Sequence, residues 1–384
     1  MKILFTCQPA FGHLHPLIPL AQAFVKAEHQ VAFVSSASFC PIITRLGFEC
    51  FPGGLDWLES EAEKHFPELH QIPLIDQGDW FLSVAFADIV ASAMVPDLLT
   101  IAREWQPDLI VRDYWEFAGY LVGEKLAIPH VTAGIGRFIP MSSMIRLIGP
   151  QMNVLRQQLA LPSDPNLETL FRHRYLHFFP TSYQPLREVL PNARAARPLI
   201  FDQAEGQTLP AWFTTLPAQP TVYATLGTVF NKSIPIFSEA LLDLQTEALN
   251  LILTVSHDLD PQDFGLQPPQ VHIERYIPQT LLLPHCDLVI CHGGYNTLMA
   301  ALSFGVPLLI IPISDDHPYY AERSTVLGVA ITLEPQAATP TAFKEAVSRL
   351  LTEPTYRANA RRLQQEIAAM PGPETVVRWL EETG

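Results

Sequence analysis

Short apolar runs separated by helical patterns recur along the chain and predict alternating strands and helices. Residues 2–7 form an apolar run, residues 16–27 have helical periodicity, and residues 31–35 form a second apolar run. Apolar runs at 108–111 and 128–132, with a helical stretch at 118–126 between them, repeat the arrangement. Continuous apolar strands are typical of parallel sheets that are covered on both faces. The first part of the chain is therefore predicted to be a parallel α/β domain.

A second strand–helix series follows a stretch that is rich in proline. Residues 191–220 show little periodicity and predict a linker. Strands are then expected at 221–225, 250–255, 288–291 and 307–312, with a helix at 233–249. From residue 341 the pattern is helical, with breaks at Pro354 and at 371–373. We expect a Rossmann-like N-terminal domain (1–200), a Rossmann-like C-terminal domain (201–365) and a helical tail (366–384) that can return to the N-terminal domain.

Composition agrees with two well-packed domains and limits the kind of partner. The chain has 384 residues and a mass of 42.9 kDa, with 48% hydrophobic and only 16% charged residues, which excludes disorder. The formal net charge of −15 argues against binding to nucleic acid or to an anionic membrane surface. It does not exclude a phosphate-bearing ligand, because local backbone dipoles can outweigh distant, screened charge.

The cysteines and the apolar segments predict a cytoplasmic protein without membrane insertion. The five cysteines are an odd number scattered through apolar stretches, and we expect them to be reduced and buried. The chain enters its first strand directly after Met1-Lys2, with no cleavage signal in this sequence. The longest apolar run, at about 298–313, is broken by Gly305, Pro307 and Pro312, so it predicts helix, turn and strand.

A glycine-rich turn is the strongest candidate for a ligand site. The strand-like run at 286–291 leads into residues 292–297 (His-Gly-Gly-Tyr-Asn-Thr), and an apolar helix at 298–304 follows. Two glycines allow a tight turn and close approach of a ligand, and the first N–H groups of the helix form an anion site with the helix dipole. Taken alone, the hexapeptide is more typical of an ordinary strand-to-helix loop than of a ligand site.

A second candidate site follows the first strand. Gly12 and His13 lie in the turn before Pro16, where an open α/β sheet places its ligands. Asp113 ends the strand that begins at residue 108. A carboxylate there can accept the imidazole N–H, set the tautomer and support His13 as a general base. The alternatives are a structural histidine and an aspartate that caps the next helix.

Segments in the second half carry a resemblance to a known family. The segments are, in order, 276–279 (YIPQ), 283–287 (LPHCD), 292–297 (HGGYNT), 305–307 (GVP) with Pro312, 316–318 (DHP) and 321–323 (AER). Together they resemble the donor-binding signature of family 1 glycosyltransferases, which have the GT-B fold, and among these the bacterial natural-product enzymes that act on macrolides, enediynes and aromatic polyketides. The resemblance covers nearly the whole chain, although residues 52–86 and 140–196 match only in character.

The resemblance implies a fold, a reaction and roles for particular residues. It implies two Rossmann-like domains with an interdomain cleft, and an inverting, metal-independent transfer of a sugar to a hydroxyl of a small hydrophobic acceptor. His13 would be the general base and Asp113 its support. The nucleotide sugar would be a co-substrate, with no cofactor. Its binding residues would be Gly12, Thr228, Tyr276, Ile277, His292, Gly293, Gly294, Asn296, Thr297, Asp316 and His317.

Departures from the family pattern bear on the donor. Tyr276 stands where many relatives have Trp, and His317 stands where Gln is commoner, which leaves the sugar undefined. Ala300 stands where plant relatives place a Glu for the ribose hydroxyls, so the resemblance favours a dTDP-sugar over a UDP-sugar. A zinc site formed by the Cys and His residues at 285–292 is disfavoured, because the strand between them separates the pairs. The alternatives are a nucleotide-sugar 2-epimerase and a catalytically inactive partner protein.

Overall fold

Two compact units make up the chain. The computed structural model describes residues 1–186, 190–202, 204, 206–225, 241, 243–255, 259–313 and 316–382, without the side chains of residues 74 and 75. Unit 1 consists of Met1–Leu199 and Met370–Gly384, and unit 2 of Ile200–Ala369. Each unit contains one parallel sheet among the described residues.

Unit 1 is built on a seven-stranded parallel sheet in the order β3-β2-β1-β4-β5-β6-β7. The strands are β1 (Lys2–Thr6), β2 (Gln30–Ser35), β3 (Glu49–Pro52), β4 (Leu109–Asp113), β5 (His130–Gly134), β6 (Arg174–His177) and β7 (Ala193–Ala195). The strand order reverses between the neighbours β1 and β4. In open α/β sheets, ligands bind beyond the carboxyl ends of the strands at this point. The loops after β1 and β4 therefore form the expected site of unit 1.

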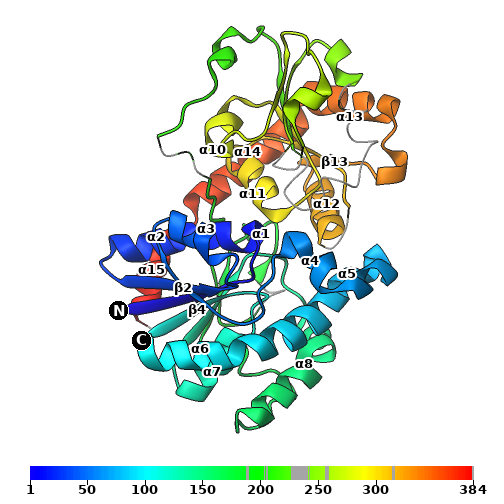
Figure 1. The fold of residues 1–384 in the computed structure, drawn as a ribbon. Helices are drawn as coiled ribbons and strands as arrows, with labels where there is room; N and C mark the ends of the chain where they lie inside the picture. The colour runs from blue at the N-terminus through cyan, green and yellow to red at the C-terminus, as the bar shows by residue number, and fades with distance from the viewer. Residues whose placement is uncertain are drawn as a thin grey trace. The chain divides into compact units, whose positions relative to one another are not determined.

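Helices cover the sheet of unit 1, and the last of them comes from the end of the chain. α6 packs against α7, and α15 packs against α2 (Figure 1). Arg174 Nη1 donates to the Trp379 carbonyl at 2.6 Å, which ties the tail to β6. The helices are α1 (Phe11–Leu14), η1 (His15–Leu17), α2 (Ile18–Lys26), α3 (Cys40–Arg45), η2 (Glu59–Glu61), α4 (Ala62–His65), η3 (Pro67–Gln71), α5 (Leu74–Trp80), η4 (Phe81–Val90), α6 (Ala91–Trp105), α7 (Ala118–Leu126), α8 (Met141–Gln158) and α15 (Pro373–Glu381).

One helical stretch of unit 1 is long and apolar. Asp76–Trp105 meets the length and composition of a membrane span, and 44% of its most apolar window is buried inside the protein. The stretch runs through α5, η4 and α6, and side chains such as Leu82, Phe86 and Leu98 belong to the core of unit 1. A core helix passes the same test of length and composition, so the stretch is weak evidence for a membrane span.

Unit 2 is built on a six-stranded parallel sheet in the order β10-β9-β8-β11-β12-β13. The strands are β8 (Thr221–Thr225), β9 (Asn250–Thr254), β10 (Val271–Glu274), β11 (Leu288–Cys291), β12 (Leu308–Ile310) and β13 (Ala330–Thr332). The helices are η6 (Ala211–Thr215), η7 (Leu244–Thr246), η8 (Pro261–Phe264), α10 (Gln279–Leu282), η9 (Leu283–His285), α11 (Tyr295–Ser303), α12 (His317–Val326), η10 (Pro335–Ala337), α13 (Pro340–Thr352) and α14 (Pro354–Ala369). The reversal of strand order falls between β8 and β11, so the turn after β11 occupies the ligand-binding edge.

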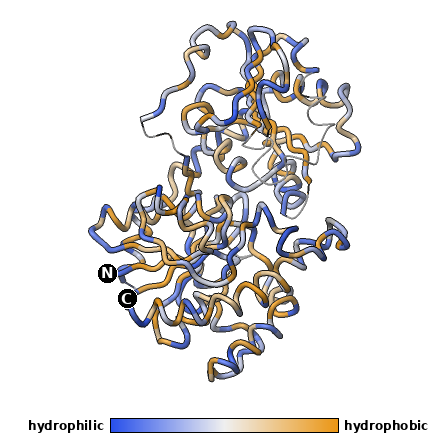
Figure 2. Tube along the Cα trace, in the orientation of Figure 1, coloured by the Kyte–Doolittle hydropathy of each residue, from blue (hydrophilic) through white to orange (hydrophobic). Residues whose placement is uncertain are grey.

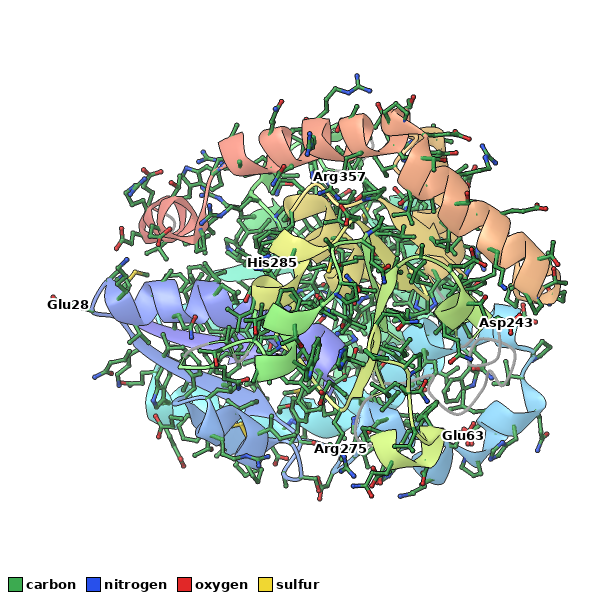
Figure 3. All side chains as sticks on the ribbon, turned by 90° about the horizontal axis from the view of Figure 1, so that it is seen from above. Glu28, Glu63, Asp243, Arg275, His285 and Arg357 are labelled. Atoms are coloured by element: carbon green, nitrogen blue, oxygen red, sulfur yellow. A yellow bond between two sulfur atoms is a disulfide. The ribbon has the colours of Figure 1, made fainter. Side chains whose placement is uncertain are left out.

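Hydropathy follows the layers in each unit. The central strands are apolar and lie inside (Figure 2), and all side chains of β4, β5, β8 and β9 are buried. Charged side chains such as Glu28, Glu63 and Arg275 project outward (Figure 3). Proline stands at the first turn of α13, α14 and α15, which explains the predicted breaks at Pro354 and at 371–373, because proline begins a helix well but does not continue one.

Two predicted segments are the helix at 233–249 and the linker at 191–220. The helix expected at 233–249 lies mostly outside the described residues, and its end contains the short helix η7. The stretch 191–220, expected to be a linker, contains β7, which pairs with β6. The short strand was missed because three residues of mixed character (Ala193–Ala195) produce no measurable periodicity.

The expectation that all five cysteines are reduced is wrong. Cys40, at the start of α3, forms a disulfide with Cys50 on β3 (Figure 3), and their Cα atoms are 5.4 Å apart. Packing of α3 on β3 brings the two residues together, which their separation in sequence did not reveal. Cys7, Cys286 and Cys291 are free and buried, as expected. Cysteine usage therefore no longer supports a cytoplasmic location.

Candidate functional site

His13 and Asp113 meet at the carboxyl edge of the sheet in unit 1. His13 lies in α1, directly after the loop that follows β1, and Asp113 is the last residue of β4. His13 Nδ1 is 2.9 Å from Asp113 Oδ2, and the side chains are 12% and 0% exposed. Because an ionised carboxylate can only accept, Nδ1 carries the proton in the neutral imidazole and leaves Nε2 with a lone pair. The pair has the geometry of a base with its orienting carboxylate.

Backbone donors hold the Asp113 carboxylate in place. The Gln8 N–H donates to Oδ2 at 3.0 Å, and the Trp115 N–H donates to Oδ1 at 2.7 Å. Burial alone would raise the pKa of Asp113, but the nearby His13 and the hydrogen bonds from His13, Gln8 and Trp115 lower it below its usual value. Asp113 therefore stays ionised at neutral pH and can stabilise a positive charge on His13.

A buried carboxylate behind the pair fixes the start of α7. Glu116 accepts hydrogen bonds from Thr6 Oγ1 and from the first N–H groups of α7, at Ala118 and Gly119. Arg112 is fully buried and donates to the Glu116 carbonyl at 2.8 Å. Burial raises the pKa of Glu116, and its hydrogen bonds and Arg112 oppose the rise. These contacts keep the end of β4 rigid.

Glu59 approaches the other nitrogen of His13. Its Oε2 lies 3.5 Å from His13 Nε2, and the Glu59 side chain is 24% exposed. The residue belongs to the short helix η2, within the stretch 52–86 that matches the family pattern only in character. The sequence pattern did not identify Glu59, since a glutamate between apolar and charged neighbours in such a region carries no signal for a site.

In unit 2 the glycine-rich turn joins β11 to α11. α11 begins at Tyr295, with Gly294 as its N-cap, three residues before the apolar helix expected at 298–304. No side chain caps this end, and the N–H of Leu298 closes the first turn on the Gly294 carbonyl at 3.1 Å. The structure thus presents backbone donors and the positive end of a nine-residue helix at the ligand-binding edge.

Two imidazoles flank this turn. The His292 and His317 rings are 4.7 Å apart between centroids, and His317 begins α12. A side chain at Gly294 would meet His292 Nε2, because an added Cβ would lie 2.6 Å from it. Burial and, to a smaller extent, the neighbouring His317 lower the pKa of His292 to about 3, and burial lowers the pKa of His317 to about 4. Both rings are therefore neutral at pH 7, and His292 is half-buried with a fully buried Nδ1.

The other predicted donor-site residues are only partly brought together by the described contacts. Gln279 Nε2 donates to Thr297 Oγ1 at 3.4 Å, which links the segment at 276–279 to the first turn of α11. Tyr276 is 49% exposed, whereas Ile277 is buried. Asp316 is the N-cap residue of α12, and Asn296 lies in the first turn of α11. Thr228 lies outside the described residues, and Gly12 lies in unit 1 beside His13.

Gly293→Ala is expected to destabilise unit 2 by about 1–3 kcal/mol. Gly293 has φ +95°, which L-residues avoid, and an added Cβ would lie 2.9 Å from Ile310 Cγ2. The free energy of unfolding, measured by urea denaturation, tests this expectation. Gly12→Ala is the matched control, because nothing lies within 4 Å of its added Cβ. Equal stabilities of the two variants would contradict the conformation assigned to the turn.

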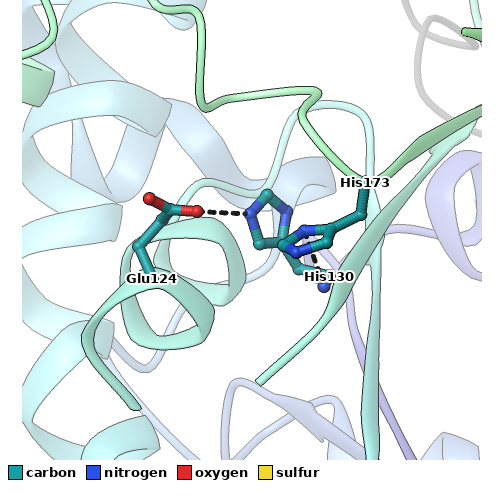
Figure 4. A group of neighbouring side chains, drawn as sticks. All are labelled: Glu124, His130 and His173. Atoms are coloured by element: carbon teal, nitrogen blue, oxygen red, sulfur yellow. Dashed lines mark hydrogen bonds and ion pairs between the residues drawn. The ribbon is translucent and has the colours of Figure 1, made fainter. Parts of the chain in front are cut away.

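One group of residues in unit 1 has the chemistry of metal ligands. Glu124, His130 and His173 come from three segments, and one ligand atom of each lies within 4.8 Å of the others (Figure 4). His130 Nε2 is 3.3 Å from Glu124 Oε1, and the other Glu124 oxygen is 3.6 Å from Arg172 Nη1 and 3.9 Å from Arg156 Nη1. Two guanidinium groups on the same carboxylate disfavour a dication there. We interpret the group as a structural network in which Glu124 of α7 forms ion pairs with Arg156 and Arg172 and a hydrogen bond with His130 of β5.

Comparison with known proteins shows that the chain is similar to glycosyltransferases. The family described as "Erythromycin biosynthesis protein CIII-like, C-terminal domain" matches residues 240–383. The chain is 29% identical to L-demethylnoviosyl transferase of Streptomyces niveus, with 99% of this chain and 97% of that protein covered. It is 26% identical to 4'-demethylrebeccamycin synthase of Lentzea aerocolonigenes, with 96% of each covered. The chain is a glycosyltransferase that is similar to these natural-product enzymes.

Solved structures assign this glycosyltransferase to the GT-B fold. The glycosyltransferase VinC in complex with DTDP aligns with a TM-score of 0.81 at 26% identity, covering 100% of this chain and 99% of that one. The calicheamicin glycosyltransferase CalG4 aligns with a TM-score of 0.83 at 22% identity, covering 100% and 98%. The strand orders of both sheets agree with two Rossmann-like domains, as the sequence predicted.

Proposed function

We propose that this glycosyltransferase transfers a sugar, with inversion, from a nucleotide-diphosphate donor to a hydroxyl group of a small hydrophobic natural-product acceptor. The observation that carries the proposal is the His13–Asp113 pair at the point where the strand order of unit 1 reverses. Relatives of the chain support a natural-product acceptor. They include an aclacinomycin-T 2-deoxy-L-fucose transferase and a 10-deoxymethynolide desosaminyltransferase.

His13 acts as the general base. As the acceptor oxygen attacks the anomeric carbon, the acceptor O–H bond breaks and its proton moves to His13 Nε2. The anomeric C–O bond to the diphosphate breaks at the same time, and its electron pair leaves with the diphosphate. Asp113 stays ionised, accepts the hydrogen bond from Nδ1 and stabilises the imidazolium. A positioned histidine of this kind contributes about 10²–10⁴-fold to the rate.

The donor binds the glycine-rich turn of unit 2. The first-turn N–H groups and the dipole of α11 receive the diphosphate, and their field stabilises its growing negative charge. His292 and His317 are neutral and act as hydrogen-bonding groups, with His317 and Asp316 towards the sugar and Tyr276 and Ile277 towards the base. Because backbone donors carry the stabilisation, we propose that the reaction needs neither a metal nor a cofactor.

Aromatic rings near His13 support a flat, hydrophobic acceptor. The Phe86 ring lies 6.2 Å from the His13 ring between centroids, and it contacts Phe81 and Trp115 at 5.7 and 6.4 Å. Phe81 and Trp115 are half-buried, so each keeps surface for a ligand. Aromatic walls with a few convergent polar groups are typical of small-molecule sites.

An activity assay with a donor and acceptor panel tests the proposed function. The protein is incubated with dTDP- and UDP-sugars and with aromatic polyketide and macrolide aglycones, and products are identified by mass spectrometry. We expect glycosylated aglycone and free nucleoside diphosphate in equal amounts, unchanged by EDTA. Conversion of the nucleotide sugar without any acceptor would support a 2-epimerase. Nucleotide binding without turnover across the panel would indicate an inactive partner protein.

dTDP is expected to bind about 3–10-fold more tightly than UDP. Ala300 lies in α11 and has no oxygen that could accept a hydrogen bond from the 2′-hydroxyl of a uridine donor. The thymine methyl group adds apolar burial, and together the two effects are worth about 1 kcal/mol. The DTDP complex of VinC supports this choice. Isothermal titration calorimetry measures both affinities, and tighter binding of UDP would contradict the preference.

A further inference from the structure

We propose that Glu59 is a positioning residue that supports His13 from the side opposite Asp113, so that two carboxylates flank the base. The proposal rests on the proposed role of His13. Glu59 Oε2 lies 3.5 Å from Nε2, and Asp113 Oδ2 lies 2.9 Å from Nδ1. Each ring nitrogen of His13 thus has its own carboxylate, and the two come from segments that are far apart in sequence.

The backbone around Glu59 is anchored next to the base. The Glu59 N–H donates to the Pro9 carbonyl at 3.2 Å, in the loop that leads into α1. Two residues earlier, the Trp57 carbonyl accepts a hydrogen bond from Ser36 Oγ at 2.7 Å, and the Trp57 side chain is 1% exposed. Glu59 therefore does not project from a free loop, because hydrogen bonds at Glu59 itself and at Trp57 fix its approach to His13.

The tautomer of His13 determines how the Glu59 carboxylate affects it. Since Asp113 accepts the proton on Nδ1, neutral His13 presents a lone pair at Nε2, and a lone pair facing a carboxylate is unfavourable. When Nε2 takes the acceptor proton, the same carboxylate faces an N–H and the contact becomes an ion pair. Glu59 therefore favours the product of proton transfer and raises the proton affinity of the base. Glu59 itself stays ionised in this step, and the imidazolium later loses its proton to water.

Other groups around His13 do not duplicate this effect. From η4 the neutral Phe86 ring contacts the imidazole, and on the neighbouring turn His15 contacts the Phe11 ring. Arg112 and Glu116 lie behind Asp113, where Arg112 Nη1 donates to the Glu116 backbone carbonyl and the Glu116 carboxyl group bonds Thr6 and the start of α7. In the part of the chain that the structure describes, Glu59 and Asp113 are the carboxylates within ion-pair distance of His13.

Glu59→Gln tests the proposal, because it keeps the size of the side chain and removes its charge. We expect the acid limb of the kcat/KM–pH profile to move down by about half a pH unit to one unit and kcat to fall about 3–10-fold. KM for the nucleotide sugar is expected to stay within about twofold. Glu59→Asp should recover part of kcat. Glu61→Gln is the matched control, since Glu61 lies on the same short helix but pairs with Lys64 at 2.6 Å.

A titration separates this proposal from the proposed function. The Cε1–H resonance of His13, identified by its loss in His13→Ala, is followed by NMR against pH in the wild type and in Glu59→Gln. A lower midpoint in the variant supports the role of Glu59. If Glu59→Gln leaves both the titration midpoint of His13 and kcat unchanged, the proposed role of Glu59 is wrong, even if His13→Ala is inactive. If His13→Ala keeps full activity, the proposed base is wrong, whatever the titration shows.

Discussion

His13→Ala is expected to lower kcat for sugar transfer by about 10²–10⁴-fold. The variant removes Nε2, the atom proposed to accept the acceptor proton, and leaves the Asp113 carboxylate without its imidazole partner. The nucleotide is proposed to bind the turn after β11, in the other unit, so the Kd for dTDP should stay within about twofold. Initial rates of glycoside formation and calorimetric titration of dTDP measure the two quantities.

A second histidine variant controls for nonspecific effects of the substitution. His70→Ala removes a side chain that is 62% exposed and lies near Glu63, and it should leave kcat unchanged. Thermal denaturation of both variants shows whether the fold is kept. A His13→Ala protein that transfers sugar within about tenfold of the wild-type rate would rule out His13 as the base.

Acidification from pH 7 to pH 5 is expected to lower the free energy of unfolding by several kcal/mol. Burial lowers the pKa of His130, His177 and His317 to about 4 and that of His292 to about 3. The unfolded pKa of histidine is near 6.5, so between these values the unfolded chain binds protons that the folded chain does not. Stability is therefore lost as the pH falls below about 6.5, by roughly 1–2 kcal/mol for each histidine at pH 5.

The hydrogen bonding of these rings explains the effect. His130, His177 and His292 each have a fully buried Nδ1 that has no hydrogen-bond partner in the described structure. Protonation would place an N–H there without an acceptor. Protonation of both His292 and His317 would also bring two positive charges together, since their rings are 4.7 Å apart. Glu116 opposes the trend, because its raised pKa favours proton uptake by the folded chain.

Urea denaturation at pH 8, 7, 6 and 5, followed by circular dichroism, measures this dependence. Unit 1 contains His130 and His177 and unit 2 contains the other two, so each transition should move with pH. His177→Gln removes one titrating group and keeps a donor for the Gln184 carbonyl, which His177 Nε2 contacts at 3.0 Å. The variant should reduce the slope of the free energy of unfolding of unit 1 against pH by up to about 1.4 kcal/mol per pH unit. If the free energy of unfolding changes equally with pH in the wild type and in His177→Gln, the lowered pKa of His177 is contradicted.

Local patterns predicted most of the fold. The apolar runs at 2–7 and 221–225 became β1 and β8, and the helical stretch at 118–126 became α7 with the same bounds. These elements are recognisable because a buried parallel strand is apolar throughout and a long amphipathic helix repeats its apolar positions. β7 and the helical stretch through η4 were missed, since a three-residue strand and an almost uniformly apolar helix have no usable period.

The two candidate sites differ in how far the sequence could describe them. The donor turn is contiguous, so its residues at 292–297 could be read directly, and the structure changed only the start of α11. The base site is assembled from three separate segments. His13 and Asp113 were found because each follows an apolar strand, whereas Glu59 follows no strand and stands at no recognisable position.

By itself the sequence determined the two α/β domains, the order of the donor motifs and the presence of His13 and Asp113 at strand ends. These features depend on neighbouring residues, and local periodicity records them. Only the tertiary structure decided that Nδ1 of His13 meets Asp113, that Glu59 lies at Nε2 and that Cys40 is bonded to Cys50. These contacts depend on which strands become neighbours and how each loop packs on them, and spacing along the chain does not encode that arrangement.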